Sequence, residues 1–227
     1  MDLEEFEKFT ADVPLFSNLN AQERMAIHNA MIQRSFNSGE IIVHEDDNEN
    51  QTFFIIVSGS VHVTVISNEG KQSILATLRS GEFFGEMAIL DGEPRSASVI
   101  AADKCKLLML YRKSFISILQ EYPKITIAML VEMSRRLRRS NRHINSLSMM
   151  SVYGRVADVL LQLSKDNGRK VGSMIVVEDR PTHQTIADMA GTSRETVSRV
   201  LSQLQKKGYL TITRKRLVIL NEEKLYY

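Results

Sequence analysis

The 227-residue sequence contains one cysteine, no tryptophan and only four prolines. A single cysteine excludes a disulfide framework, and it cannot supply the several thiolates of an iron–sulfur cluster or a structural zinc site. The five histidines are scattered along the chain and show no spacing of helical metal ligands. We therefore predict no metal and no permanently bound cofactor, and we expect the lone Cys105 to be a buried strand residue.

Long apolar segments are also missing. No run of 18 or more apolar residues occurs, so no membrane-spanning helix is predicted. Three of the first five residues are acidic, whereas a signal peptide begins with basic residues and continues with an apolar stretch. We expect a cytoplasmic protein. We do not expect an enzyme, because the sequence shows no nucleophile with an adjacent base and no P-loop glycine pattern.

Basic residues are concentrated toward the C-terminal end of the chain. Residues 1–150 contain 16 Lys and Arg against 19 Asp and Glu, a net charge of −3. Residues 151–227 contain 13 against 8, a net charge of +5. At roughly 150 residues per domain, the length fits two domains better than one. A small basic domain after a mildly acidic one predicts a polyanionic partner at the C-terminal end.

The first half of the chain predicts a helix followed by short strands. Asn20 and Glu23 have the spacing of a capping box for a helix over residues 20–32. Short β-rich runs then alternate with glycine-containing turns, which is typical of a small antiparallel barrel or roll. The predicted strands are residues 41–43, 53–57, 61–66, 74–78, 97–100 and 106–111.

A long helix is predicted from Pro123 to about Met150. Its apolar residues step by three and four, as in a coiled-coil seam, with a polar interruption at Ser140. A second copy of the helix in a homodimer is the natural cover for this stripe, and packing on its own domain is the alternative. The predicted interface residues are Leu130, Met133, Leu137, Ile144 and Leu147. The outer face is expected to expose Arg135, Arg136, Arg138, Arg139 and Arg142.

The segment after Ser151 predicts a helix-turn-helix with a wing. Ser151 can cap a helix to about Lys165, residues 166–168 predict a turn, and residues 171–177 predict a hairpin. Residues 182–201 have helix-turn-helix spacing, with Gly191 at the turn. Two short strands, predicted at residues 210–213 and 217–220, enclose a cationic tip that suits phosphate contact.

The second helix of this motif has a surface that suits the reading of base edges. Ser193 can cap it, and its outward positions lie near its N-terminal end, where a recognition helix meets DNA. Arginine can bind guanine through O6 and N7, and glutamate can accept from cytosine N4. A solvated helical hairpin with incidental charge is the alternative. The predicted DNA-binding residues are Thr182, Ser193, Arg194, Glu195, Thr196, Ser198, Arg199, Arg214, Lys215 and Arg216.

Residues 85–97 have the chemistry of a site for a small phosphorylated ligand. Amides at residues 85–88 can open a short helical turn whose N-terminus favours an anion. Arg95 can neutralise a phosphate with two hydrogen bonds, and Glu86 can accept from a sugar hydroxyl. From the residues alone, a salt bridge between Glu86 and Arg95 within the roll is equally open.

Two motifs of the chain resemble those of one protein family. Phe84-Gly85-Glu86-Met87-Ala88-Ile89-Leu90 with Pro94-Arg95-Ser96-Ala97 resembles the phosphate-binding cassette of cyclic-nucleotide-binding domains. Thr192-Ser193-Arg194-Glu195-Thr196-Val197-Ser198-Arg199 resembles the recognition helix of the cyclic AMP receptor protein family, which groups with the fumarate-nitrate-reductase regulators of bacteria. The similarity spans nearly the whole chain. It implies an α+β fold: a jelly-roll-like cyclic-nucleotide-binding β-roll (1–122), a dimerisation helix and hinge (123–150), and a winged helix-turn-helix (151–227).

The resemblance also implies roles for individual residues. It places Glu86 on the ribose 2′-hydroxyl, Arg95 and Ser96 on the cyclic phosphate, and the Gly85 amide on the ligand. Ser140 and Asn141 stand where the family has a Thr-Ser pair that touches the base from the two subunits, and Asn141 departs from that pattern. The implied nucleotide-binding residues are Gly85, Glu86, Met87, Ala88, Arg95, Ser96, Ser140 and Asn141.

The function implied by the resemblance is that of a homodimeric transcription regulator. A cyclic nucleotide would control its binding to an inverted-repeat DNA site, with cyclic AMP favoured over cyclic GMP or cyclic di-GMP, and RNA polymerase would be a further partner. The absence of N-terminal cysteines separates the chain from the iron–sulfur oxygen sensors of the family. A regulator that binds DNA constitutively and a cyclic-nucleotide-binding module that controls a partner protein are the alternatives.

Overall fold

A computed structural model describes the whole chain except residues 12, 50, 68, 71, 179, 214, 222–224, 226 and 227 and the side chains of residues 143 and 147. The chain divides into two compact units, Met1–Arg138 and Arg139–Tyr227, and the division falls within helix α5 (Pro123–Met149). Each unit has its own hydrophobic core. None of the helices in the described ranges is long and apolar enough to cross a membrane.

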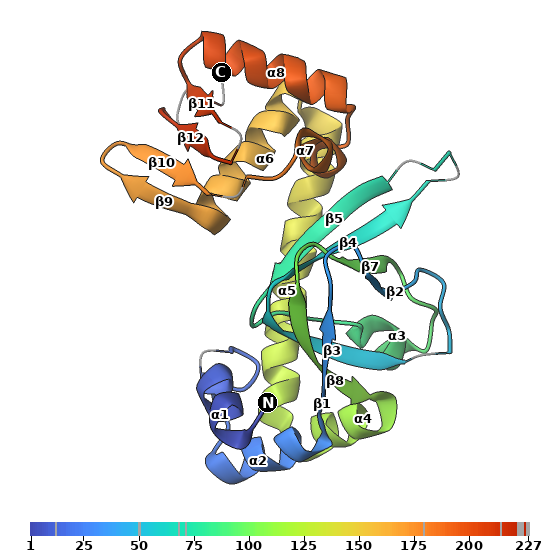
Figure 1. Cartoon of the computed structure of the whole chain (residues 1–227). Helices are drawn as coiled ribbons and strands as arrows, with labels where there is room; N and C mark the ends of the chain where they lie inside the picture. The colour runs from blue at the N-terminus through green and yellow to red at the C-terminus, as the bar shows by residue number, and fades with distance from the viewer. Residues whose placement is uncertain are drawn as a thin grey trace. The chain divides into compact units, whose positions relative to one another are not determined.

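Unit 1 contains a roll of two four-stranded antiparallel sheets (Figure 1). One sheet has the order β1-β8-β3-β6, and the other has the order β2-β7-β4-β5. Apolar side chains from both sheets meet in a shared core, which confirms the predicted roll. The strands are β1 (Ile32–Phe36), β2 (Ile41–Val43), β3 (Thr52–Ser58), β4 (Ser60–Ile66), β5 (Gln72–Arg79), β6 (Phe83–Phe84), β7 (Ser98–Ala101) and β8 (Cys105–Tyr111).

Helices cover the sheet that contains β3, so that β3 is buried on both faces. Phe53 and Ile55 point into a core shared with the helices, while Phe54 and Ile56 point into the core between the sheets. This two-sided burial explains why the strand is apolar at successive positions instead of alternating. The remaining helices of unit 1 are α1 (Leu3–Ala11), α2 (Ala21–Ala30), α3 (Glu86–Asp91) and α4 (Arg112–Glu121).

Unit 2 is a winged helix-turn-helix whose helices pack on a four-stranded sheet of order β11-β12-β10-β9 (Figure 1). Leu160, Ile186, Val200 and Leu217 are among the side chains of its core. The elements are α6 (Val152–Asn167), β9 (Gly168–Val171), β10 (Met174–Val177), α7 (His183–Ala190), α8 (Arg194–Lys206), β11 (Leu210–Ile212) and β12 (Leu217–Ile219).

Side-chain caps define where the helices of both units begin. Asn20 and Glu23 form the predicted capping box of α2, each side chain accepting from the backbone N–H of the other residue. The predicted caps Ser151 and Ser193 accept from the third amide of α6 and of α8, respectively. These caps satisfy amides that have no partner within the helix.

The predicted turn at residues 166–168 is wrong. Helix α6 continues through Asn167, because buried Leu163 and Ser164 hold its last turn against the core. Gly168 then begins β9 directly. A Cβ atom at Gly168 would lie 2.1 Å from the Ser164 carbonyl oxygen, so only glycine allows the strand to leave the helix this closely.

Arg155 connects three backbone carbonyl groups of unit 2. Its Nε donates to the Ala190 carbonyl oxygen at 2.9 Å, and its Nη1 and Nη2 donate to Met150 and Gly191, each at 3.3 Å. Ala190 and Gly191 lie at the C-terminal end of α7, where carbonyls lack partners within the helix and a cation is favourable. Arg155 therefore fixes the turn of the helix-turn-helix against the beginning of α6.

We expect Arg155→Ala to lower the free energy of local opening at the end of α7 by about 0.5–1.5 kcal/mol, because the part-buried Ala190 carbonyl and the exposed carbonyls of Met150 and Gly191 lose their donor. Hydrogen exchange of peptides covering residues 182–201 measures this change. Arg169→Ala is the matched control, because Arg169 is exposed on strand β9. Equal protection in the two variants would contradict a structural role for Arg155.

Candidate functional site

The residues of the predicted nucleotide cassette surround the beginning of α3. Gly85 precedes this helix in the left-handed conformation, with φ +86°. A Cβ atom at Gly85 would lie 2.5 Å from the Thr52 carbonyl oxygen and 2.8 Å from Arg95 Nη1. Both the backbone conformation and the close approach therefore require glycine. This glycine allows the chain to pass directly over the Arg95 guanidinium.

Arg95 is a buried cation with 4% of its surface exposed. Its Nη1 donates to the Gly85 carbonyl oxygen and its Nη2 to the Thr52 carbonyl oxygen, both at 2.9 Å. Burial lowers the pKa of Arg95, and the carboxylates of Asp47 and Glu86 act in the opposite direction. Arginine stays protonated under all ordinary conditions. The cassette thus holds a fixed positive charge at a place largely shielded from water.

Glu86, the first residue of α3, is a buried acid with 3% of its surface exposed. Burial raises the pKa of Glu86, and the charge of Arg136 is the largest opposing influence. Arg136 Nη1 donates to Glu86 Oε1 at 3.2 Å, and its Nη2 donates to the Phe83 carbonyl oxygen. The same guanidinium lies 4.4 Å from the centre of the Phe83 ring. Helix α5 is therefore bound to the cassette through one arginine.

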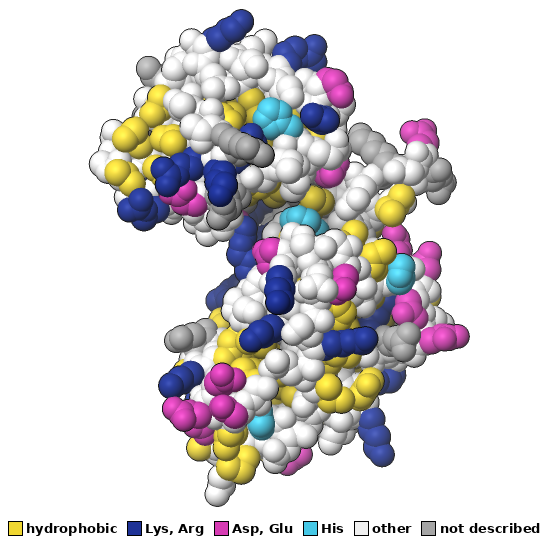
Figure 2. All heavy atoms as spheres, viewed as in Figure 1, with side chains coloured by type: hydrophobic (Ala, Val, Ile, Leu, Met, Phe, Trp, Pro, Cys, Tyr) yellow, Lys and Arg dark blue, Asp and Glu magenta, His cyan; other side chains and the backbone are white. Residues whose placement is uncertain are grey.

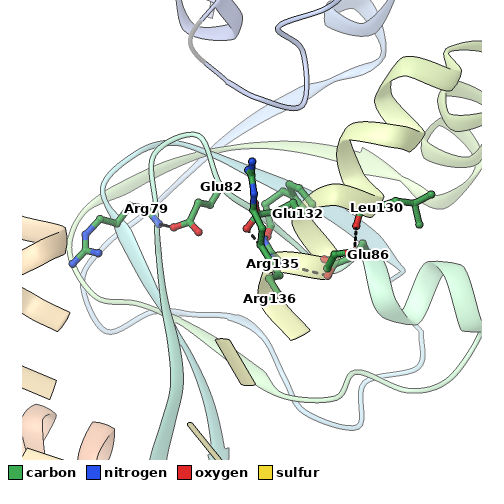
Figure 3. A network of polar contacts seen from close by, with 9 residues as sticks. Arg79, Glu82, Glu86, Leu130, Glu132, Arg135 and Arg136 are labelled. Atoms are coloured by element: carbon green, nitrogen blue, oxygen red, sulfur yellow. Dashed lines mark hydrogen bonds and ion pairs between the residues drawn. The ribbon is translucent and has the colours of Figure 1, made fainter. Parts of the chain in front are cut away.

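Figure 3 shows Arg136 at the centre of a network of charged residues around α5. Glu132 Oε1 lies 3.8 Å from Arg136 Nε, and Glu132 Oε2 lies 3.5 Å from Arg135 Nη1. The carboxylate of Glu132 thus lies between the two arginines. This pair of contacts limits the positions that Arg136 can take beside Glu86.

The expectation that Arg136 lies on the exposed cationic face of the long helix is wrong. Its side chain is 22% exposed and contacts Glu86 and Phe83. The reason is that Arg136 shares a helix face with Ile125 and Met129, which are buried in the core of unit 1. The periodicity of these apolar residues was the signal that could have placed Arg136 toward the roll.

The other predicted nucleotide-binding residues differ in their surroundings. Ala88 is buried, and Met87 and Ser96 are exposed with their side chains in contact, Ser96 Oγ lying 3.7 Å from Met87 Sδ. Ser140 and Asn141 lie on the exposed surface of α5, within unit 2. The structure brings Gly85, Glu86 and Arg95 together around α3, and it describes Ser140 and Asn141 as residues of the other unit.

The predicted interface residues do not all share one environment. Leu130, Leu137 and Ile144 are 59%, 64% and 61% exposed, respectively. Met133 is half-buried and packs against the core of unit 1. The side chain of Leu147 lies outside the described residues. Helix α5 therefore presents large apolar side chains to solvent along its length.

The predicted reading residues lie on the outer surface of α8. Arg194, Glu195 and Arg199 are exposed, and Thr196 and Ser198 are half-buried. Figure 2 shows that, among the charged side chains on the visible face of unit 2, basic ones prevail, whereas acidic side chains gather over parts of unit 1. This distribution agrees with the charges of the two parts of the sequence.

The remaining predicted DNA-binding residues are caps and wing residues. Thr182 and Ser193 accept from backbone amides at the beginnings of α7 and α8. In the wing, Lys215 and Arg216 are exposed, and Arg216 Nε lies 2.6 Å from Glu178 Oε2. Arg214 lies outside the described residues.

Three residues that the sequence analysis missed, Arg180, His183 and Gln184, lie beside this surface. A cavity of about 440 Å³ is lined by Arg180, Thr182, His183, Gln184 and Arg194. His183 Nδ1 lies 2.9 Å from the Oγ atom of Ser198 on α8. Arg180 Nε donates to the Thr213 carbonyl oxygen of the wing at 3.0 Å. The only sequence signal for His183 was its position directly after the cap Thr182. Its contact with Ser198 gave no sequence signal, because that contact joins two helices.

Comparisons with known proteins identify both parts of the chain. Residues 33–122 match the cyclic nucleotide-binding domain family, and residues 154–226 match the Crp-like helix-turn-helix domain family. A solved structure of the regulator CLP from Xanthomonas campestris, described as responsive to c-di-GMP, has a TM-score of 0.77 at 24% identity, covering 88% of this chain and 99% of that chain. This likeness shows a shared fold.

Two curated relatives are similar to the chain over most of their length. The cyclic AMP receptor protein of Thermus thermophilus is 32% identical over 199 residues, which cover 88% of each chain. The cAMP-activated global transcriptional regulator CRP of Escherichia coli is 32% identical over 186 residues, which cover 80% of this chain and 86% of that protein. With a cyclic nucleotide-binding domain followed by a Crp-like helix-turn-helix, the chain belongs to the cyclic AMP receptor protein family of bacterial DNA-binding transcription regulators.

Proposed function

We propose that the protein is a homodimeric transcription regulator whose binding to an inverted-repeat DNA site is switched by a cyclic nucleotide, with cyclic AMP favoured. The observation that carries this proposal is the buried pair Arg95 and Glu86 at α3, in a chain whose recognition helix exposes Arg194. Residues 1–122 would act as the sensor, residues 123–150 as the dimerisation helix and hinge, and residues 151–227 as the DNA-binding domain.

The charges of the cassette suit a cyclic nucleotide. Arg95 donates to two neutral carbonyl oxygens, and a phosphate is a stronger acceptor for a guanidinium. Ser96 is exposed at the same site and can donate a further hydrogen bond. Glu86 can accept from a ribose hydroxyl, because Arg136 favours its ionised form against the effect of burial. Gly85, Met87 and Ala88 would contribute their backbone.

The proposal also concerns which base the bound nucleotide carries. The names of both curated relatives refer to cyclic AMP, which supports cyclic AMP as the ligand. The Xanthomonas protein, described as responsive to c-di-GMP, supports the alternative that another nucleotide binds in the same fold. Ser140 and Asn141 would contact the base. A pocket that binds no nucleotide, in a regulator that binds DNA constitutively, is the second candidate.

Nucleotide binding would change the contacts of α5. A ligand that takes Glu86 as an acceptor alters the partner of Arg136 and so the fit of α5 on the roll. Such a ligand favours DNA binding only if it binds the DNA-competent state more tightly than the resting state. In that state, the two recognition helices would lie about 34 Å apart, one turn of DNA. RNA polymerase would be a further partner of a regulator bound in this way.

Gly85→Ala is expected to abolish saturable nucleotide binding, because its Cβ atom would displace Arg95 or the Thr52 carbonyl group. Titration calorimetry of the full chain with cyclic AMP, cyclic GMP and cyclic di-GMP measures the binding. Gly92→Ala is the matched control, since Gly92 ends the same helix at φ +78° with no atom within 4 Å of the added Cβ. Equal binding by the two variants would argue against this site, and no binding by the unmodified chain would favour the second candidate.

Leu137→Glu is expected to convert the dimer to monomers, because it places a charge in the proposed seam with Leu130 and Ile144. Sedimentation velocity measures the state of association. Leu75→Glu is the control, because Leu75 is similarly exposed but lies on β5. The seam is excluded if Leu137→Glu and the unmodified chain sediment alike, whether both are dimers or both are monomers.

Arg194→Ala is expected to cost about 1–3 kcal/mol of discrimination at one guanine of the half-site. Fluorescence anisotropy with DNA that differs at single base pairs measures this loss. Lys215→Ala is the comparison, because a wing residue on phosphate should weaken binding to all sequences and reduce the salt slope by about one. An equal loss of affinity for every sequence in Arg194→Ala would show that Arg194 contacts phosphate instead.

A further inference from the structure

A hydrogen bond between side chains connects the two helices of the helix-turn-helix. His183 is the first residue of α7, and its Nδ1 atom lies 2.9 Å from Ser198 Oγ on α8. Both side chains are half-buried. Ser198 follows Arg194 on the recognition helix by about one turn, so it lies on the face that would meet base edges. A titratable group thus contacts a residue of the proposed reading surface.

The surroundings of His183 are basic. The cavity beside it is lined by Arg180, from the segment before α7, and by Arg194, from the start of α8. The charges of these two arginines act on His183, and the uncharged Thr182 and Gln184 complete the lining. Arg180 is held in place by its bonds to the carbonyl oxygens of Thr213 and Pro181. A cavity with this lining suits the phosphate group of a polyanion such as DNA.

The presence or absence of a hydrogen on His183 Nδ1 determines which hydrogen bond remains available at Ser198, because this atom accepts without the hydrogen and donates with it. In the neutral form with its hydrogen on Nε2, the imidazole accepts at Nδ1 and Ser198 donates its hydroxyl hydrogen to it. Ser198 Oγ can then only accept from a base, as from adenine N6 or cytosine N4. In the protonated form, Nδ1 donates to Ser198 Oγ, and the hydroxyl hydrogen is free to be donated to guanine O6 or thymine O4.

We propose that neutral His183 carries its hydrogen on Nε2 and that a proton added at Nδ1 reverses the direction of the Ser198 hydroxyl, so that the base preferred opposite Ser198 depends on pH. This inference rests on the proposed DNA-binding function and deepens it. The proton is taken from solvent, and no covalent bond changes. His183 is a positioning residue in this scheme, because it acts on the base through Ser198.

The expected pH range follows from the same surroundings. Burial, together with the charges of Arg180 and Arg194, lowers the pKa of His183 below its ordinary value of 6.5, so the free protein holds a neutral imidazole above that pH. A DNA phosphate in the cavity favours the charged form and raises this pKa. DNA binding therefore takes up a proton, and affinity rises as the pH falls toward 6 and below.

The test is a selection of sequences from DNA with a randomised half-site, carried out with the full chain at about pH 8 and about pH 6. Parallel selections contain cyclic AMP, cyclic GMP or cyclic di-GMP. At one position, the ratio of adenine and cytosine to guanine and thymine should fall by about two- to tenfold at the lower pH, which corresponds to one hydrogen bond. His183→Gln and Ser198→Ala should show no such change at that position.

His44→Gln is the matched control, because His44 is exposed in unit 1 and should leave the pH-dependent preference intact. A circular dichroism spectrum and a melting temperature equal to those of the unmodified chain show that His183→Gln is folded. A base preference that is the same at both pH values, or a change that persists in His183→Gln, overturns the inference while DNA binding stands. No enriched sequence under any condition overturns the proposed function itself.

Discussion

The contact between Glu86 and Arg136 is the interaction on which unit 1 depends. A carboxylate with 3% exposure is costly to bury without a partner, and Arg136 supplies both a hydrogen bond and a charge. The arginine belongs to α5 and the acid to α3, so the pair joins the cassette to the long helix. Any ligand that uses Glu86 as an acceptor therefore acts on α5 directly, without an intermediate element.

Unit 2 depends on a different constraint, which is that the backbone amides and carbonyls at its helix ends need hydrogen-bond partners. Ser151, Thr182 and Ser193 satisfy amides at the beginnings of three helices, and Arg155 satisfies carbonyls at the end of α7. The contacts of Arg155 fix the end of α7 and the following turn against α6. The recognition helix can then carry polar and charged residues on its outer surface at no cost to the core, because Val197, Val200, Leu201 and Leu204 supply its packing.

The features that could be predicted from the sequence are those encoded by neighbouring residues. The capping box at Asn20, the cap at Ser193 and the strands of the roll follow from local spacing, and the structure confirms them. Strands β1 and β6 were missed, because β1 is largely exposed and polar and β6 has only two residues. Helices α1 and α4 were also missed.

The features that could not be predicted are contacts between distant segments. The helical periodicity could have placed Arg136 toward the roll, but it could not name Glu86 and Phe83 as its partners, since they lie far away in the sequence. The contact between His183 and Ser198 likewise needs the packing of α7 on α8. For the same reason, Arg95 was recognised as a cation, whereas its bonds to the carbonyls of Gly85 and Thr52 were not foreseen.

The central claim is that the nucleotide site and the DNA site are coupled. The most direct measurement is the affinity of the full chain for cyclic AMP, cyclic GMP and cyclic di-GMP with and without saturating DNA. Linkage requires that DNA strengthen nucleotide binding by the same factor by which the nucleotide strengthens DNA binding, and such coupling is typically about 5- to 150-fold. We expect equal factors in this range for one nucleotide. An affinity for every nucleotide that DNA leaves unchanged would contradict the account.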